Sequence, residues 1–175
     1  MLKKIAIVPV LLVAPACGAP AGSSESSDAA ALTSAPATYS VPVPAELADQ
    51  ATFPVDSVSW NATAERASLK YDLPPELVGT RARVALDGAF DPARGVYALS
   101  GPAGTAECTV AGASLTCNER LPGVPVDVAR ATELAAGSPG AAKRAEVIRR
   151  FGVDPIGILT ATLRRDDGVD DRRER

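Results

Sequence analysis

The sequence predicts one α+β domain that is mainly antiparallel β-sheet, with a C-terminal helical pair before a last strand. Two observations support this prediction. Short runs of alternating apolar and polar residues are separated by Gly and Pro, which is typical of strands with one buried face. Beyond residue 126 the alternation gives way to apolar residues at helical intervals. We therefore expect a meander of about six to seven strands, arranged as a sandwich or a half-barrel.

The domain is expected to begin near residue 41, and its first strand is expected over 53–63, with Trp60 as the largest side chain. Two runs follow, 67–73 and 81–87, and each alternates strictly. A period of two residues over this length is typical of a half-buried antiparallel strand. The two runs are therefore predicted to pair with one another.

The register of this pair is predicted from its connection. Two prolines and a glycine punctuate the segment 74–79. If that segment is the loop, Leu73 faces Thr80 and Tyr71 faces Ala82. Large inward residues then lie opposite small ones, which favours close packing.

The outer face of the same pair carries the candidate anion-binding site. The predicted register sets Asp72 against Arg81, as an ion pair, and Lys70 against Arg83. Like charges directly opposed are destabilising unless an anion lies near them. Lys70, Arg81 and Arg83 are therefore a candidate cationic patch for an anionic group, and the alternative is a solvated sheet face screened by Asp72 and salt.

The next segment, 87–95, contains Asp-Gly and Asp-Pro and is expected to be a turn-rich link. Strands are expected over 96–100 and 105–110, joined by a tight turn. The link does not have the alternating acidic residues of a calcium-binding loop. No metal ion and no cofactor are expected.

The hairpin around Gly112-Ala113 is the best-determined local structure. With these two residues at the centre of a type II′ turn, Cys108 and Cys117 fall directly opposite one another. They occupy a pair without backbone hydrogen bonds, where Cα atoms lie close enough for a disulfide. The spacing suits no zinc site, and the chain has no His to complete one. A structural Cys108–Cys117 disulfide is predicted.

Two helices are expected after this hairpin. Asp127 is placed to cap a helix over 128–136, and Ser138 to cap a second helix that ends at Gly152. Apolar residues recur at three-residue intervals on one side of the second helix, while charged residues occupy much of the rest. This pattern favours packing on the sheet over binding to a membrane surface. A final strand is expected over 156–163.

The first 17 residues indicate the compartment. Lys3 and Lys4 precede an apolar run over 5–13, and small residues at 14–16 lead to Cys17. A cationic start, a short hydrophobic run and a small-residue cleavage site are typical of a secretory signal. The apolar run is shorter than the roughly 20 residues that a membrane-spanning helix needs. We expect export of the chain.

The boundary Val13-Ala14-Pro15-Ala16-Cys17-Gly18 resembles the cleavage region of bacterial lipoprotein precursors. The resemblance covers about the first 20 residues, and it departs from the family at Ala14 and Pro15, where Leu and a small non-proline residue are usual. It implies that Cys17 is diacylated and becomes the first residue of a protein held in the cell envelope. Ala14-Pro15-Ala16 also fits ordinary signal cleavage, which would release a soluble secreted protein.

The expected organisation has four parts. Residues 1–16 form the signal peptide and 17–40, rich in Ala, Ser, Gly and Pro, a disordered lipid-anchored tether. Residues 41–163 form the β-rich domain, and 164–175 a disordered charged tail. With Cys17 acylated, the two remaining cysteines form an even pair, as expected in an oxidising compartment.

The sequence favours binding over catalysis. The absence of His removes Ser-His and Cys-His nucleophiles, and no catalytic or phosphate-binding motif is present. A net charge of −3 argues against a nucleic-acid partner. We expect a non-enzymatic envelope lipoprotein with a disulfide-closed binding or structural domain, whose partners are the membrane, through its lipid, and another envelope protein or glycan. The alternatives are a soluble secreted inhibitor or ligand carrier and a carboxylate-based hydrolase of envelope glycans.

Overall fold

The computed structural model of the chain describes residues 31–34, 37–42 and 52–165. Within these ranges the strands are β1 (Ala31–Ser34), β2 (Ala37–Ser40), β3 (Thr52–Val55), β4 (Val58–Ala62), β5 (Arg66–Leu73), β6 (Ala82–Asp91), β7 (Val96–Gly101), β8 (Gly104–Ala111), β9 (Ser114–Arg120), β10 (Ile156–Thr162) and β11 (Arg164–Arg165). The helices are α1 (Pro75–Val78), α2 (Val128–Ala135) and α3 (Ala141–Val153).

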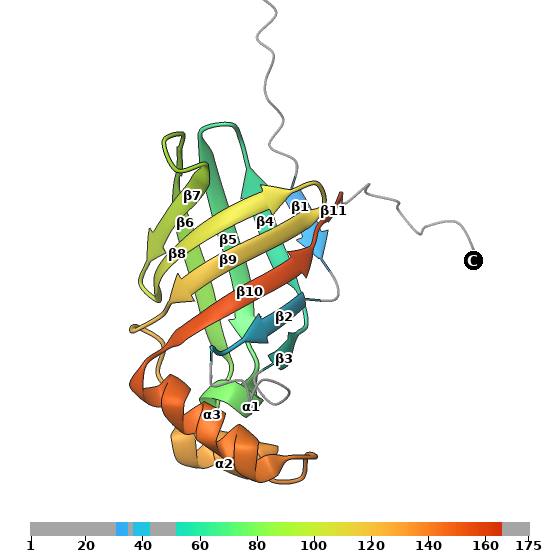
Figure 1. Cartoon of the computed structure of the whole chain (residues 1–175), viewed down its shortest axis with the longest axis vertical. Helices are drawn as coiled ribbons and strands as arrows, with labels where there is room; N and C mark the ends of the chain where they lie inside the picture. Colours follow the sequence, from blue (N-terminus) through green and yellow to red (C-terminus); the bar gives the residue numbers. More distant parts are fainter. Residues whose placement is uncertain (1–30, 35–36, 43–51, 166–175) are drawn as a thin grey trace, which may run out of the picture.

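All these strands form one antiparallel sheet in the order β11-β1-β4-β5-β6-β7-β8-β9-β10-β2-β3. β1 pairs with both β11 and β4, while β2 pairs with both β10 and β3. Only two residues separate β1 from β2 in the sequence, and only two separate β3 from β4. The two edges of the sheet therefore meet, and the sheet curls into a nearly closed barrel with the helices at one end (Figure 1).

The predicted class, a mainly antiparallel domain with helices before a last strand, is confirmed. The expected tether, 17–40, is wrong in its last part, because β1 and β2 belong to the barrel. Their sequences, ALTS and ATYS, are short, and the strands on either side supply the pairing partners. The two-residue strand β11 likewise extends the barrel beyond residue 163.

The pairing of β5 with β6 is confirmed, but its predicted register is wrong by two residues. Leu73 faces Ala82 and Tyr71 faces Val84. The connection is longer than expected because it folds into the short helix α1, which ends at Gly79 in the left-handed conformation (φ 85°). A shift of two residues keeps every side chain on its predicted face and changes only its partner.

Two expected segments also differ in extent. The run 53–63 is divided at Asp56–Ser57, because β3 pairs with β2 whereas β4 pairs with β1 and β5. The expected link 87–95 is strand as far as Asp91. Gly88 allows this, since a Cβ there would overlap the carbonyl oxygen of Ala98 on β7.

The inward side chains fill the barrel with one continuous core that includes Trp60, Leu69, Leu86, Leu115 and Leu159, all at most 1% exposed. Eight-stranded and similarly small barrels have interiors just wide enough for side chains to fill. The core therefore holds the sheet together and fills its interior.

The helices cover one end of the barrel (Figure 1). Asp127 caps α2 as predicted, accepting a hydrogen bond from the Arg130 backbone N–H at 2.9 Å. The predicted cap at Ser138 is wrong: its hydroxyl donates to the carbonyl of Ala135, and α3 begins only after Gly140. Apolar residues of α3 are buried, which confirms packing of this helix on the domain.

The β8–β9 hairpin has the predicted register, with Thr109 opposite Thr116 and Cys108 opposite Cys117. Gly112 has a φ of 59° and Ala113 does not have a positive φ, as a type II′ turn requires. The Cys108–Cys117 disulfide is present, with Cα atoms 4.0 Å apart and both residues fully buried. The predicted bridge is confirmed.

Candidate binding site

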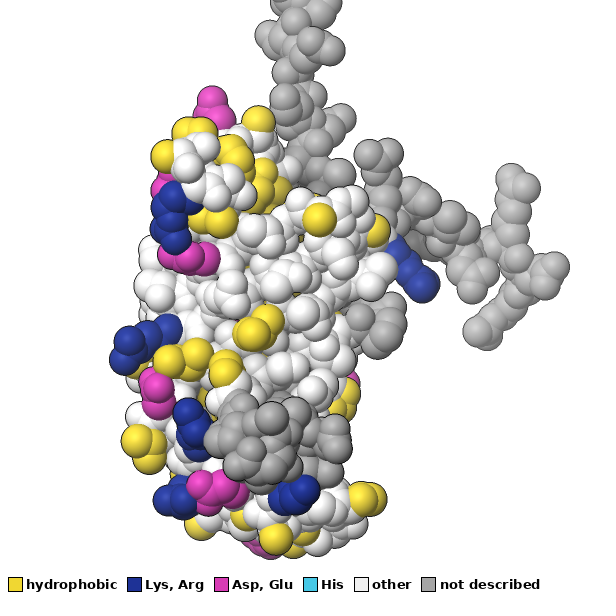
Figure 2. Space-filling view, viewed as in Figure 1, with side chains coloured by type: hydrophobic (Ala, Val, Ile, Leu, Met, Phe, Trp, Pro, Cys, Tyr) yellow, Lys and Arg dark blue, Asp and Glu magenta, His cyan; other side chains and the backbone are white. Residues whose placement is uncertain are grey.

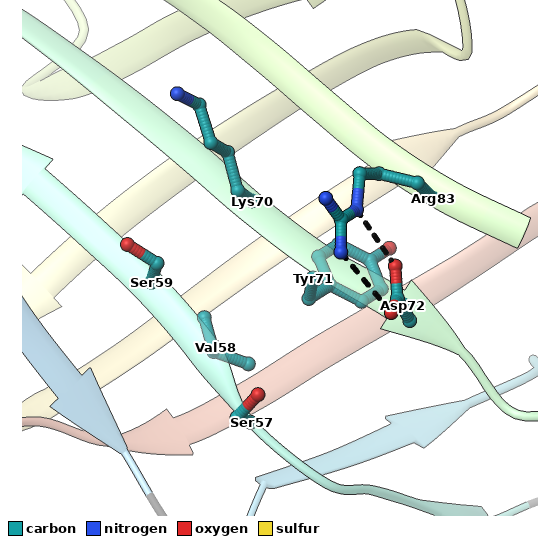
Figure 3. A pocket seen from close by; sticks show the side chains of 7 residues that line it. All are labelled: Ser57, Val58, Ser59, Lys70, Tyr71, Asp72 and Arg83. Atoms are coloured by element: carbon teal, nitrogen blue, oxygen red, sulfur yellow. Dashed lines mark hydrogen bonds and ion pairs between the residues drawn. The ribbon is translucent and has the colours of Figure 1, made fainter.

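A hollow of about 260 Å³ lies on the outer face of the barrel over β4, β5 and β6 (Figure 3). We call it the Lys70 pocket. Its lining comes from three neighbouring strands and from the break between β3 and β4: Ser57, Val58, Ser59, Lys70, Tyr71, Asp72 and Arg83.

Strand register explains how these polar groups come together. Lys70 lies opposite Ser59 on β4 and Ala85 on β6. Arg83 lies opposite Asp72, so Lys70 and Arg83 are diagonal neighbours on the same outer face. The predicted like-charge opposition of Lys70 and Arg83 is therefore wrong, but both cations line one pocket.

Asp72 partly neutralises the cations. The Nε of Arg83 donates to one carboxylate oxygen of Asp72 at 3.0 Å, and this hydrogen bond lowers the pKa of Asp72 below its ordinary value. The Arg81 Nε lies 4.0 Å from the other oxygen. Lys70 has no ion-pair partner among the described residues. It is the uncompensated cation of the pocket.

Arg81 lies next to the Lys70 pocket but does not line it. It lines a second hollow with Asp56, Asp72 and Glu76, and a third beside the turn at Pro102. The second hollow contains three carboxylates, and Arg81 forms its ion pair there with Asp72. The structure thus brings Lys70 and Arg83 into one pocket, while Arg81 lies beside Arg83, on the same Asp72 carboxylate, but outside that pocket.

Figure 2 shows the opposite side of the barrel, where charged side chains lie mainly toward the periphery and the helical end. The outer face of β9, β10 and β2 is rich in hydroxyls, and its charged residue on β9 is Arg120 at the strand end. Thr116, Thr160 and Thr38 lie in register across it, and the Thr38 and Thr160 hydroxyls are 2.7 Å apart.

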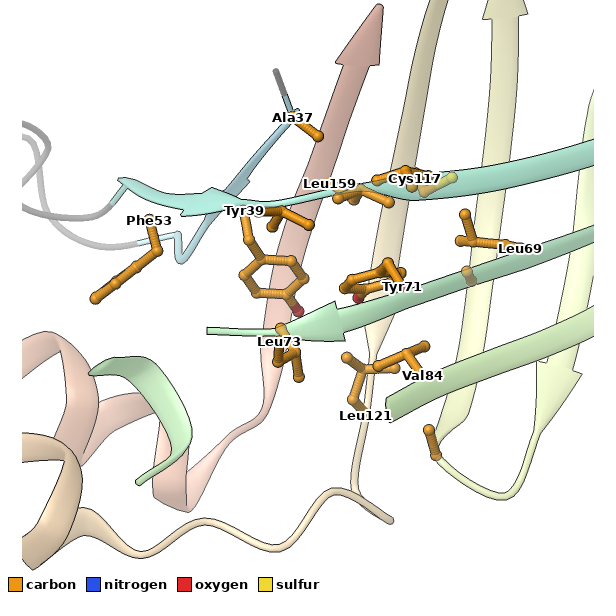
Figure 4. Packing of buried hydrophobic residues seen from close by; sticks show 14 of the residues in the cluster. Ala37, Tyr39, Phe53, Leu69, Tyr71, Leu73, Val84, Cys117, Leu121 and Leu159 are labelled. Atoms are coloured by element: carbon orange, nitrogen blue, oxygen red, sulfur yellow. The ribbon is translucent and has the colours of Figure 1, made fainter. Parts of the chain in front are cut away.

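A second polar cluster lies inside the barrel. Glu119 points inward from β9 and is only 3% exposed, the only buried charged residue in the described part of the chain. The Tyr71 hydroxyl donates a hydrogen bond to it from β5. The Tyr39 ring stacks beside Tyr71, with centroids 6.3 Å apart (Figure 4). We call Glu119, Tyr71 and Tyr39 the interior cluster.

Burial is the largest cause of the pKa shifts in this cluster. Desolvation raises the pKa of Glu119 from 4.5 to about 8, against the opposing effect of the Tyr71 hydrogen bond. Desolvation and the nearby Glu119 also raise the pKa of both tyrosines. All three groups are therefore neutral in the folded protein near pH 7.

Sequence reasoning missed the interior cluster, although a signal was present. With Leu115 and Cys117 pointing inward, the alternation of β9 puts Glu119 inward as well. It also missed Ser57 and Ser59, because the break between β3 and β4 was not expected. Cys17 lies outside the described residues, so its acylation stays a prediction.

The described residues contain no cluster of three or more His, Cys, Asp or Glu side chains arranged to hold a metal ion. None of their helices combines the length and apolarity needed to cross a membrane. Comparison of the chain with family models, with curated proteins and with solved structures gives no match.

Proposed function

We propose that this chain is an exported, lipid-anchored protein of the cell envelope whose disulfide-closed barrel binds an anionic glycan at the Lys70 pocket. Membrane attachment through acylated Cys17 follows from the leader sequence. The buried Cys108–Cys117 bridge supports an oxidising compartment, since disulfides are rare in cytosolic proteins.

The observation that carries the binding proposal is the uncompensated Lys70 beside two serine hydroxyls. A carboxylate or phosphate can pair with its ammonium group, and Arg83 can add a second contact by sharing its guanidinium with Asp72. Ser57 and Ser59 supply hydroxyls that can bond to the hydroxyls of a sugar. A sugar that carries an acid group matches both kinds of contact.

The same observations favour this function over the alternatives. A carrier would need room in the barrel interior, which side chains fill. A carboxylate hydrolase would need two facing acids, whereas Asp72 is the only carboxylate that lines the Lys70 pocket and it is paired with Arg83. A soluble inhibitor differs from our proposal in lacking the anchor, which is tested separately.

Binding is tested by NMR titration of the barrel with glucuronate, with inorganic phosphate as a second probe. We expect amide shifts at Ser57, Ser59 and Lys70, and at least a tenfold weaker response in Lys70→Ala. Arg150→Ala, which removes an exposed cation on α3, is the matched control and should bind normally. Equal shifts in Lys70→Ala, or no response to either probe, would contradict the proposed site.

The anchor is tested by mass spectrometry of full-length protein extracted from membranes of an expressing bacterium. We expect a mature chain that begins at Cys17 and carries added acyl mass, and its loss from the membrane fraction in Cys17→Ser. A mature N-terminus without acyl mass would leave the soluble secreted protein as the correct function class.

A further inference from the structure

We propose that the binding site continues from the Lys70 pocket into a neighbouring hollow on the same strands, and that its ligand is a glycan in which an acidic sugar is linked to a neutral one. This inference rests on the proposed function and defines its ligand more closely. The Lys70 pocket takes the acid group, and the neighbouring hollow takes the hydroxyl and amide groups of the neutral sugar.

The neighbouring hollow has a volume of about 190 Å³ and lies over the beginning of β5. We call it the Asn61 hollow. Its lining comes from β4, β5, β6 and the turn that follows β4: Asn61, Thr63, Arg66, Ala67, Ser68 and Asp87.

The two hollows meet end to end, because they use successive outward positions of the same strands. On β4, Ser59 lines the Lys70 pocket and Asn61, two residues later, lines the Asn61 hollow. On β5, Lys70 and Ser68 have the same relation. Ser59 pairs with Lys70, and the next outward pair is Asn61 with Ser68. Successive outward positions lie about 7 Å apart along a strand, so the combined site is long enough for two linked sugars.

Lys70 lies at the boundary between the two hollows. Its ammonium group points away from Arg83 and back toward the beginning of β5, where the Asn61 hollow lies (Figure 3). It has no ion-pair partner in the part of the chain that the structure describes. An acid group that pairs with this ammonium therefore places the next sugar of its chain over the Asn61 hollow.

The Asn61 hollow offers hydrogen-bonding groups that the protein itself does not use. Asn61, Ser68 and Asp87 lie opposite one another on β4, β5 and β6. Within the described ranges, none of these three side chains forms a hydrogen bond or an ion pair. An amide, a hydroxyl and a carboxylate together donate and accept hydrogen bonds, as the hydroxyl groups of a sugar require.

The charges of the Asn61 hollow favour a neutral sugar over a second acidic one. Arg66 and Asp87 both line the hollow, but they do not pair with each other. Their opposite charges leave the hollow without net charge, whereas the Lys70 pocket keeps the positive charge of Lys70. Asp87 repels an acid group and accepts hydrogen bonds from hydroxyls, so it selects against a second acidic sugar.

The ligand class is tested by NMR titration of the full-length protein at physiological salt with two tetrasaccharides. In the hyaluronan tetrasaccharide, glucuronate alternates with N-acetylglucosamine, so a neutral sugar lies on each side of the inner acid. In tetragalacturonate every sugar carries an acid group. Glucuronate and galacturonate are the single-sugar references.

We expect the hyaluronan tetrasaccharide to bind about tenfold more tightly than glucuronate, because it adds hydrogen bonds in the Asn61 hollow. It should shift the amides of Asn61, Ser68 and Asp87 in addition to those of the Lys70 pocket. Tetragalacturonate should gain over galacturonate only the statistical factor of its several acid groups.

Two substitutions separate the contributions of the two hollows. Asn61→Ala should weaken binding of the hyaluronan tetrasaccharide about fivefold and leave glucuronate binding unchanged. Asp87→Asn should remove the repulsion of a second acid and strengthen tetragalacturonate binding about fivefold. Asn118→Ala, on the outer face of β9, and Glu133→Gln, on α2, remove an exposed amide and an exposed carboxylate elsewhere. These matched controls should bind as wild type.

The outcomes distinguish this inference from the proposed function. Glucuronate shifts at the Lys70 pocket, with no added shift or affinity from the hyaluronan tetrasaccharide, would overturn the inference and leave the proposed function standing. A larger gain for tetragalacturonate than for the hyaluronan tetrasaccharide would also overturn it, because the Asn61 hollow would then accept an acid. Absence of binding by every probe would overturn both.

Discussion

The ring of Tyr39 occupies the space that a Cβ of Gly157 would take. The two residues lie on adjacent strands, and the absence of a side chain at Gly157 lets Tyr39 cross β10 and reach the interior cluster. A glycine in the middle of a strand usually weakens the strand, but here it makes room for a large aromatic side chain.

Gly157→Ala should therefore destabilise the domain, because the added methyl group must displace a fully buried ring. We expect a loss of about 1–3 kcal/mol in the free energy of unfolding, measured by urea denaturation. Gly137→Ala is the matched control, since a Cβ there meets nothing within 4 Å. A loss as large at Gly137 would show that glycine content in general, rather than the Tyr39 contact, sets the effect.

The stability of the domain should fall as the pH rises from about 5 to 8. The pKa of Glu119 is about 8 in the folded state and 4.5 ordinarily, so within this window the folded state holds a proton that the unfolded state has lost. The free energy of unfolding should then decrease by about 1.4 kcal/mol per pH unit. The difference between wild type and Glu119→Gln isolates this contribution, and parallel pH curves would refute it.

Tyr71→Phe should raise the pKa of Glu119 further, because the Tyr71 hydrogen bond lowers that pKa in wild type. NMR titration of ¹³C-labelled glutamate carboxyls measures the shift. We also expect a loss of about 1–2 kcal/mol in stability from the lost hydrogen bond. Tyr97→Phe, which removes a 2.8 Å hydrogen bond to the Thr63 carbonyl, should lose stability without moving the Glu119 titration.

Removing the disulfide with Cys108→Ala and Cys117→Ala together should lower the free energy of unfolding by about 2–3 kcal/mol, as expected for closure of a short loop. The hairpin should still form, since six further residue pairs and the Gly112 turn define its register. Denaturation of wild type with and without reductant should give the same difference. Detection of two free thiols at these positions in the oxidised protein would contradict the bridge.

The sequence predicts correctly those structures that depend only on residues close together in the chain. The Gly112 turn, the Cys108–Cys117 pair and the Asp127 cap each involve residues within ten positions of one another, where turn chemistry and alternation decide the geometry. The outer-face positions of Lys70 and Arg83 are also predicted correctly, because a change of register by two residues leaves each side chain on the same face of the sheet.

Features set by distant contacts could not be predicted in the same way. Closure of the barrel depends on β1 and β2, whose four-residue sequences, ALTS and ATYS, pair with strands far along the chain. The register of β5 and β6 depends on α1. The two prolines of this connection favour a loop, so the short helix that begins at Pro75 was not predicted. The Tyr71–Glu119 bond joins residues 48 positions apart, and no local pattern indicates that distance.

The pairing of β1 with β11 and of β2 with β10 also constrains the order in which the strands can pair during folding. β1 and β2 can pair with β11 and β10 only after those strands have been synthesised, more than 110 residues later in the chain, so the barrel closes late. A chain cut before Ile156 would leave three strands, β1, β2 and β9, each without one of its partners, and such unpaired strand edges promote aggregation.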